Sequence, residues 1–319
     1  MKSRILNLLG GIAAFMIFAA PSISFDAMIP AWISLPDHIE SIAIIDRSER
    51  EKKIINVIEG GITGEGIGQD DIASKMCLKG INDQLKNSNR YKIVRTNIQM
   101  RGKDAPMDFA HPLHWKFIEK ICNENNVDAI LALEYFDTDH IGNQLKAKVG
   151  IRIYDLKSKS IIEEYAFDHE IYTNHRNPDF VDLVTSYIDQ DAVKNLSYEA
   201  GIIYGQRIAP YWIRLTRKYY NRPKRFDNLA YGARMMEVND WDAAIPALEE
   251  ATNSRKRKVR GRAAHNLAVI YEILGDYKKA KEWAQKAWGM HRNKDSKEYT
   301  YRLNQRIREI ERLEAQLEN

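Results

Sequence analysis

The C-terminal third of the chain repeats itself at an offset of 36 residues, and this periodicity restricts the folds open to it. The positions in register hold small or aromatic residues: Gly232 with Ala268, Trp241 with Tyr277, Ala244 with Ala280, Leu248 with Ala284, and Ala251 with Ala287. Small side chains at this spacing let two antiparallel helices pack closely, and the aromatic fills the space at the turn between them. The pattern predicts two helical hairpins, at about 227–255 and 262–292.

The second copy resembles a tetratricopeptide repeat (TPR) at most signature positions, among them Ala264, Tyr271 and Ala280. The first copy matches less well because Met235 replaces the usual aromatic, and Arg255–Arg260, predicted as a loop, lengthens the period. Two such repeats rarely bury enough surface to be stable alone. We therefore expect a helix before Tyr220 to pack on one end and a capping helix, 295–317, to cover the other.

The TPR resemblance also implies a binding groove, since the first helix of each repeat lines the concave face in that family. The corresponding positions here are Phe226, Leu229, Met236, Arg262, His265, Asn266, Val269 and Glu272. Asn266 is similar to the asparagine of the family's peptide-carboxylate clamps, whereas Leu229, Ala230 and Ala233 are apolar where a clamp needs polar groups. The expected ligand is a helix or an extended peptide. The alternative is that these positions pack against a neighbouring helix of the same chain.

The part ahead of the repeats alternates between strand and helix patterns. Apolar runs at Ile42–Ile45 and Ala129–Leu133 predict buried strands, and Gln144–Tyr154 with Ser160–Tyr172 predict a hairpin. Two helices and a further strand lie between the runs, and a long helix is predicted from Asp179 past Pro210 to Tyr220. The expected fold is an α/β domain with a mixed sheet, 25–220, ending in a long helix, followed by an all-α TPR-like domain, 221–319.

The N-terminus has the pattern of a secretory signal. Lys2 and Arg4 precede the apolar run Ile5–Ala20, and small residues follow it up to Ser24. We expect residues 1–24 to be a signal peptide cleaved after Ser24, the alternative being an uncleaved membrane anchor. The predicted location is the periplasm or the outer-membrane periphery. An oxidising compartment permits a disulfide between Cys77 and Cys122, and the sequence leaves open whether they pair or stay buried thiols.

No segment carries a convincing catalytic pattern. The glycine-rich segment 60–68 lacks the Lys-Ser/Thr of a phosphate-binding loop and is interpreted as a connector. His111 and His114, with Asp104 and Asp108 nearby, suggest a metal site, but Pro112 keeps the two histidines off a shared helical face. The sequence predicts no cofactor and no metal.

Positive charge is concentrated in the C-terminal third. From Arg217 onward the chain has 23 Lys and Arg against 15 Asp and Glu, although its whole net charge is only +4. Arg255–Arg262 is the densest cluster. Nucleic acid conflicts with the secretory signal, so the expected partner of this cluster is an anionic surface or an acidic segment, and the alternative is a solvated loop.

Three stretches ahead of the repeats resemble an uncharacterised family of bacterial envelope proteins with TPR tails: Pro30–Arg47, Glu59–Glu65 and Ile208–Tyr220. The order of elements is similar to the N-terminal domains of TolB-type and curli-secretion-type envelope proteins. Many such relatives are lipoproteins, whereas this chain has no lipobox cysteine, which favours release into the periplasm. The resemblance implies architecture and compartment, and it assigns no reaction.

Together these features predict a non-enzymatic exported protein that acts as a scaffold or adaptor and binds a protein or peptide through the TPR groove. The first alternative is an assembly module, in which the α/β domain oligomerises within an outer-membrane or periplasmic complex. A third hypothesis is a metal-dependent hydrolase that uses His111, His114 and Asp108.

Overall fold

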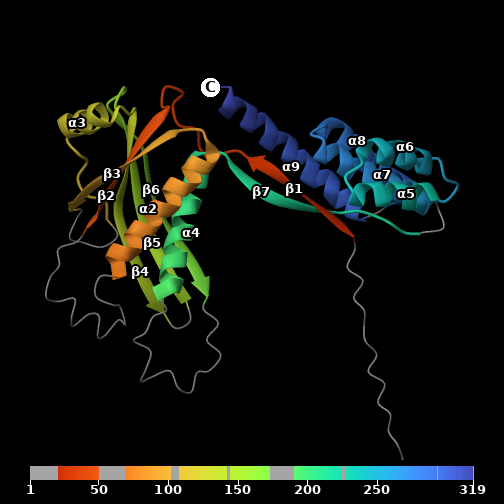
Figure 1. Ribbon diagram of the computed structural model, residues 1–319, viewed down its shortest axis with the longest axis horizontal. Coiled ribbons are helices and arrows are strands. Elements are labelled where there is room, and N and C mark those ends of the chain that lie inside the picture. Colours follow the sequence, from red (N-terminus) through yellow and green to blue (C-terminus); the bar gives the residue numbers. More distant parts are fainter. Residues whose placement is uncertain are drawn as a thin grey trace, which may run out of the picture. The chain divides into compact units, whose positions relative to one another are not determined.

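The computed structural model describes residues 21–49, 69–101, 108–141, 144–172, 190–223, 227–292 and 294–318 (Figure 1). The chain forms two compact units. The sheet unit contains residues 27–213 and 309–319, and the helical unit contains the described residues up to 26 together with 214–308. The boundaries fall inside the strands β1 (Ser22–Ile29) and β7 (Tyr211–Lys218) and inside the helix α9 (Lys294–Leu317). Each of these three elements therefore belongs to both units.

The sheet unit contains a five-stranded mixed sheet in the order β3-β2-β4-β5-β6. Its strands are β2 (Ser41–Glu49), β3 (Lys92–Arg101), β4 (Ala129–Ile141), β5 (Gln144–Asp155) and β6 (Ser160–Tyr172). β2 is parallel to both β3 and β4, whereas β5 is antiparallel to β4 and to β6. This confirms the predicted mixed α/β architecture.

Helices cover both faces of this sheet, which explains its continuous apolar runs. Ile42 and Ile44 belong to the core under α2 (Gln69–Ser88) and α4 (Gln190–Ile208), which Figure 1 shows along one face. Ala43 and Ile45 alternate with them and pack in a second core with residues of α3 (Trp115–Asn125). Alternation along β2 therefore supplies both cores from one apolar stretch.

Two glycines allow α2 and α4 to touch. A Cβ atom added at Gly80 would collide with the carbonyl oxygen of Tyr198, and one added at Gly201 would collide with that of Cys77. Only residues without a side chain allow two helix backbones to approach this closely. Each helix contributes one of the two glycines, so the crossing depends on both.

The two cysteines are buried on opposite faces of the sheet. Cys77 on α2 lies in the first core, Cys122 on α3 lies in the second, and both are free thiols. Burial raises the pKa of Cys122 to about 11. The structure thus decides between the two possibilities that the sequence left open, in favour of buried thiols.

The C-terminal helical region consists of α5 (Asp227–Glu237), α6 (Trp241–Thr252), α7 (Arg257–Ile273), α8 (Tyr277–His291) and α9. The carboxylates of Asp240 and Asp276 cap α6 and α8 by accepting bonds from Ala243 N–H and Lys279 N–H, each at 3.0 Å. The end of α9 belongs to the sheet unit, where the side chain of Gln316 bonds both the N–H of Ala31, at 2.8 Å, and its carbonyl, at 3.1 Å.

Two predictions about this region are wrong. The segment after Pro210 is the strand β7 and not a continuing helix, because Pro210 ends the helix and the side chains after it alternate in exposure. Arg257–Arg260 is the first turn of α7 and not a loop. Residues 22–24 begin the strand β1, so cleavage after Ser24 would remove its first three residues. The cleavage itself stays a prediction. The segment 1–20 and the first part of the predicted long helix, up to 189, lie outside the described residues.

None of the helices in the described part of the chain is both long enough and apolar enough to cross a membrane.

Candidate functional site

The positions predicted to line a groove lie mainly on one face of α7, and nearly all are buried. Arg262, His265, Asn266, Val269 and Glu272 follow a helical spacing, and only Arg262 is partly exposed. Leu229 and Met236 on α5 are fully buried in the helical core, and Phe226 lies outside the described residues. The structure therefore brings the polar α7 positions together, and they face the chain's own segment 217–222.

Asn266 holds the backbone of Tyr220. Its Oδ1 accepts the Tyr220 N–H at 2.8 Å, and its Nδ2 donates to the Tyr220 carbonyl at 2.8 Å. The side chain is fully buried. Because one amide satisfies both polar groups of a single residue, the contact recognises an extended main chain without depending on the side chain at that position.

His265 bonds the same segment two residues earlier. Its Nε2 lies 3.1 Å from the carbonyl oxygen of Lys218, and its Nδ1 lies 3.0 Å from the hydroxyl of Ser296. A carbonyl only accepts, so Nε2 carries the proton, and Nδ1 accepts from the serine in the neutral ring. Burial lowers the pKa of His265 to about 4, against a smaller opposing effect of the Lys218 carbonyl. The ring is therefore neutral at physiological pH.

Glu272 ends the row with a buried ion pair. Arg217 donates to both of its carboxylate oxygens, from Nε at 2.7 Å and from Nη2 at 2.8 Å. The Tyr299 hydroxyl donates to the same carboxylate. Burial, and then the charge of Glu272, raises the pKa of Tyr299 well above its ordinary value. The carboxylate is thus fully engaged within the helical unit.

Arg262 begins the row at the more exposed end of α7. Its Nη1 donates to the carbonyl of Arg222 at 2.6 Å, and its guanidinium lies 4.8 Å from the centre of the Tyr220 ring. Together with His265 and Asn266 it bonds the backbone of residues 218, 220 and 222. The α7 face binds an extended segment in this structure, and that segment belongs to the same chain.

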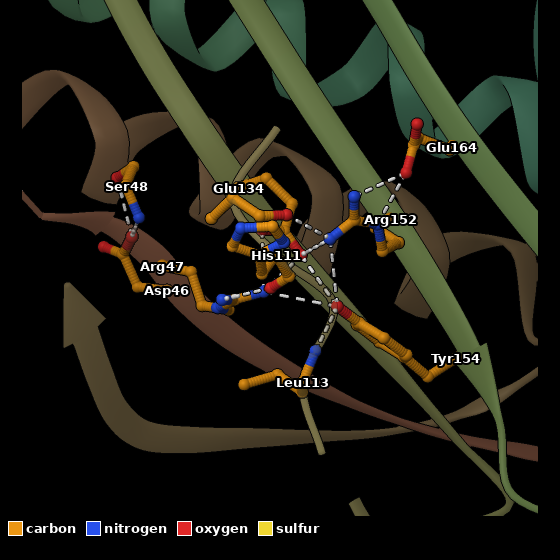
Figure 2. Close-up of polar contacts among 10 residues, drawn as sticks. Asp46, Arg47, Ser48, His111, Leu113, Glu134, Arg152, Tyr154 and Glu164 are labelled. Carbon is orange, nitrogen blue, oxygen red and sulfur yellow. Dashed lines mark hydrogen bonds and ion pairs between the residues drawn. The ribbon is translucent and has the colours of Figure 1, made fainter. Parts of the chain in front are cut away.

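A second polar cluster lies inside the sheet unit and is centred on Glu134 of β4 (Figure 2). Arg47 Nη1 donates to both carboxylate oxygens at 2.8 Å, Arg152 Nη1 to one at 3.2 Å, and the Tyr154 hydroxyl to the same oxygen at 3.1 Å. All four residues are buried. Glu164, on the neighbouring strand β6, pairs with the other side of Arg152.

This Glu134 cluster fastens the segment ahead of α3 to the sheet. Arg152 donates to the carbonyl of Ala110 at 3.0 Å, and Arg47 to that of His111 at 3.1 Å. The N–H of Leu113 donates to the Tyr154 hydroxyl at 3.1 Å, so three backbone groups of four consecutive residues are held (Figure 2). Apart from Arg47 Nε, which is buried without a hydrogen-bond partner among the described residues, the donors of the two arginines bond groups of the protein itself. These internal bonds indicate an anchoring role.

Burial and the neighbouring charges shift the pKa of Glu134 in opposite directions. Burial raises the pKa of Glu134, and the guanidinium groups of Arg47 and Arg152 act against that shift. Burial, and then the charge of Glu134, raise the pKa of Tyr154. The two guanidinium groups favour the ionised form of the carboxylate between them. Removing the carboxylate, or removing the guanidinium groups, would leave an unpaired charge in the protein interior.

His111 and His114, the two histidines of the metal hypothesis, do not form a metal site with each other. His111 is exposed and offers its backbone carbonyl to Arg47, and His114 is the N-cap of α3, where Nδ1 accepts the Lys116 N–H at 3.3 Å. Asp104 lies outside the described residues. Within the ranges that the structure describes, no three His, Cys, Asp or Glu side chains are grouped as metal ligands.

Sequence reasoning missed the Glu134 cluster. A signal for it exists, because Glu134 directly follows the apolar run Ala129–Leu133, and Arg152 stands among buried positions of β5. A charged residue inside a strand that is otherwise buried requires a partner of opposite charge. The sequence alone does not show that Arg47, on a different strand, is that partner.

The fold and these two clusters define a two-unit protein with an anchored α/β sheet unit and a helical unit that holds extended backbone. A family model described as a domain of unknown function (DUF8603) matches residues 39–220, more than half of the chain. The chain belongs to this family. A second model, also a domain of unknown function (DUF6340), matches residues 230–312. Neither description assigns an activity, and the assignment of the helices as TPR repeats stays a prediction. No curated protein gives a significant match.

Several solved structures are similar to part of the chain. A PelC dodecamer from Paraburkholderia phytofirmans has 8% identity and a TM-score of 0.28, covering 59% of this chain and 98% of that one. TolB from Acinetobacter baumannii has 8% identity and a TM-score of 0.23, covering 58% and 31%. The lipoprotein GNA1162 from Neisseria meningitidis has 12% identity and a TM-score of 0.23, covering 48% and 98%. At such TM-scores the similarities establish neither a common fold nor a common function.

Proposed function

We propose that this protein is a non-enzymatic, exported protein of the bacterial cell envelope that binds proteins or peptides as a scaffold or adaptor. Its helical unit, a pair of TPR-like repeats, is the binding element. The basic residues and apolar run at the N-terminus support export, and the repeat at an offset of 36 residues supports the TPR assignment. The observation that carries the proposal is the bidentate bond between Asn266 and the backbone of Tyr220.

The α7 face is suited to a peptide because it bonds main-chain groups. Asn266, His265 and Arg262 all bond backbone atoms of the segment 217–222, at alternate residues. Recognition of an extended backbone through such groups is a common mode of peptide binding. A partner peptide would use the same side chains, so its binding competes with the chain's own segment.

A displacement experiment tests this competition. Tyr220→Pro removes the N–H that Asn266 accepts, and it leaves every α7 side chain in place. A fluorescent peptide with the sequence of residues 213–223 should bind this variant more tightly than the wild type, as measured by anisotropy. Adding Asn266→Ala to Tyr220→Pro should abolish the gain. If Tyr220→Pro is folded by circular dichroism yet binds the peptide no better than the wild type, the α7 face is a purely internal contact.

A second candidate function is assembly through the sheet unit. β6 is a 13-residue strand at the end of the sheet order, and among the described strands it pairs only with β5. An unpaired edge of this length can accept a strand from another chain. Light scattering after size-exclusion chromatography tests the idea, with amide exchange on β6 as the second readout. A monomer at all concentrations, with β6 amides that exchange quickly, contradicts it.

A further inference from the structure

Three helix ends in the helical unit gather exposed cations. α7 begins at Arg257, α8 ends at His291 and α9 begins at Lys294. Gly261, one turn into α7, packs directly against His291 and Ala287, so the start of α7 touches the end of α8. The exposed basic residues at these ends, named here the basic end, are Arg255, Lys256, Arg257, Lys258, Arg292 and Lys294.

The charges of the basic end lack carboxylate partners within the described part of the chain. No ion pair forms there to Arg255, Lys256, Arg257 or Lys258. Arg257 Nε donates instead to the carbonyl of Met290, at 3.3 Å, which ties the start of α7 to the last turn of α8. Lys258, Arg257 and Arg262 all lower the pKa of His291, after the larger effect of its burial. Several cations therefore lie close together in one small region.

Two acidic residues in the first turns of α9 bear on this surface. Asp295 accepts the Tyr220 hydroxyl at 2.7 Å, which directs its carboxylate toward the segment held by α7. Glu298 is exposed and reduces the local charge by one. The six cations of the basic end therefore keep a clear excess of positive charge.

An indole lies beside these cations. Trp288, in the last turn of α8, is half-buried, and the Lys297 ammonium lies 5.7 Å from the centre of its ring. A partly solvent-exposed aromatic ring among lysine and arginine residues is typical of protein surfaces that contact lipid headgroups. The basic end also consists of helix ends and not of a groove, a shape that suits a broad anionic surface better than an acidic peptide.

We propose that the basic end of the helical unit binds the headgroups of anionic lipids and holds the protein against a membrane surface. The six residues of the basic end differ from Arg262, His265 and Asn266, which bond the segment 217–222. Attraction to anionic lipid amounts to about a fivefold change in binding for each Lys or Arg near the surface, equivalent to about 1 kcal/mol. Six cations are enough for measurable, salt-dependent association.

The test uses the full chain from residue 21 onward and vesicles of phosphatidylcholine, with or without one third phosphatidylglycerol. Co-sedimentation should show binding to the anionic vesicles only, weakening as salt rises. Lys256→Gln with Lys258→Gln should reduce binding about 25-fold, because each neutralised side chain contributes about fivefold. The matched control is Lys116→Gln with Lys278→Gln, which removes two exposed lysines from other places and should leave binding unchanged.

Four results would overturn the proposal. Equal binding to neutral and anionic vesicles would point to a different surface, and an equal loss in the two double variants would point to net charge alone. Binding to polyglutamate without binding to anionic vesicles would identify an acidic protein as the partner. Inorganic phosphate that releases the vesicles better than chloride at the same ionic strength would indicate a discrete phosphate site instead of a membrane surface.

Discussion

Asn266 and Tyr220 are joined by two hydrogen bonds of 2.8 Å, one in each direction, although 46 residues separate them in the sequence. The pair fixes the segment that follows β7 against α7. A position predicted to bind a partner peptide therefore stabilises the chain itself. Stability measurements on variants of this pair determine how much the contact stabilises the chain.

Asn266→Asp keeps the shape of the side chain but removes the donor to the Tyr220 carbonyl. We expect it to lower the free energy of unfolding by about 1–3 kcal/mol, because a buried carbonyl loses its partner and gains a carboxylate beside it. Urea denaturation followed by circular dichroism measures this. Gln285→Glu, an exposed amide-to-acid change on α8, is the control and should have little effect. Similar losses in both variants would show that added charge, and not the lost bond, is responsible.

The free energy of unfolding should fall as the pH is lowered, because His265 binds a proton less readily in the folded chain than in the unfolded chain. The folded-state pKa is about 4, and the unfolded value is about 6.5. The unfolded chain therefore binds a proton first, and stability is lost between about pH 6.5 and pH 4, by up to roughly 3 kcal/mol. Urea midpoints at pH 7 and pH 5 should differ less in His265→Gln than in the wild type. His111→Gln, at an exposed histidine, should keep the wild-type difference.

Glu134→Gln should be among the most damaging single changes in the sheet unit. It leaves the Arg47 and Arg152 guanidinium groups buried without a full counter-charge, which destabilises by about 3–5 kcal/mol. Glu164→Gln removes a more exposed partner of Arg152 and should cost no more than about 1 kcal/mol. Hydrogen exchange provides a second readout, since the Leu113 amide should lose protection in Glu134→Gln. If that amide stays protected, the cluster does not anchor the segment.

Two glycine-to-alanine substitutions should have opposite signs. Gly201→Ala forces a methyl group into the α2 backbone and should destabilise by about 1–3 kcal/mol. Gly289→Ala adds its methyl group to open space on α8 and should stabilise by up to about 1 kcal/mol, through helix propensity. Thermal denaturation of both variants measures the contrast. An unchanged melting temperature in Gly201→Ala would mean that α2 and α4 separate at little cost.

The sequence predicted the elements whose side-chain pattern is local. The β5–β6 hairpin follows from strict alternation at Leu145, Ala147 and Val149, and α9 follows from its apolar stripe. β7 was not predicted, because its aromatic and aliphatic residues also fit the apolar stripe of a helix. In the structure it is a strand because it pairs with β1. The Glu134 cluster was missed because its partners lie on three strands, and pairing between strands is not encoded by local spacing. The sequence predicted a partner groove at the α7 positions, and this stays a prediction. The contact of these positions with Tyr220 was not foreseen, because Tyr220 lies ahead of the repeating segment.

The hydrogen bonds between Ala31 and Gln316 determine when the sheet unit can finish folding. These residues are 285 positions apart, yet both belong to the sheet unit. The sheet unit therefore closes only after nearly the whole chain has been synthesised, and if the chain is exported, after nearly all of it has crossed the membrane. Neither unit is a continuous stretch of sequence, so a fragment cut near residue 220 would contain neither unit whole. Proteolytic removal of the last turns of α9 would for the same reason disturb the region around Ala31, which is distant in the sequence.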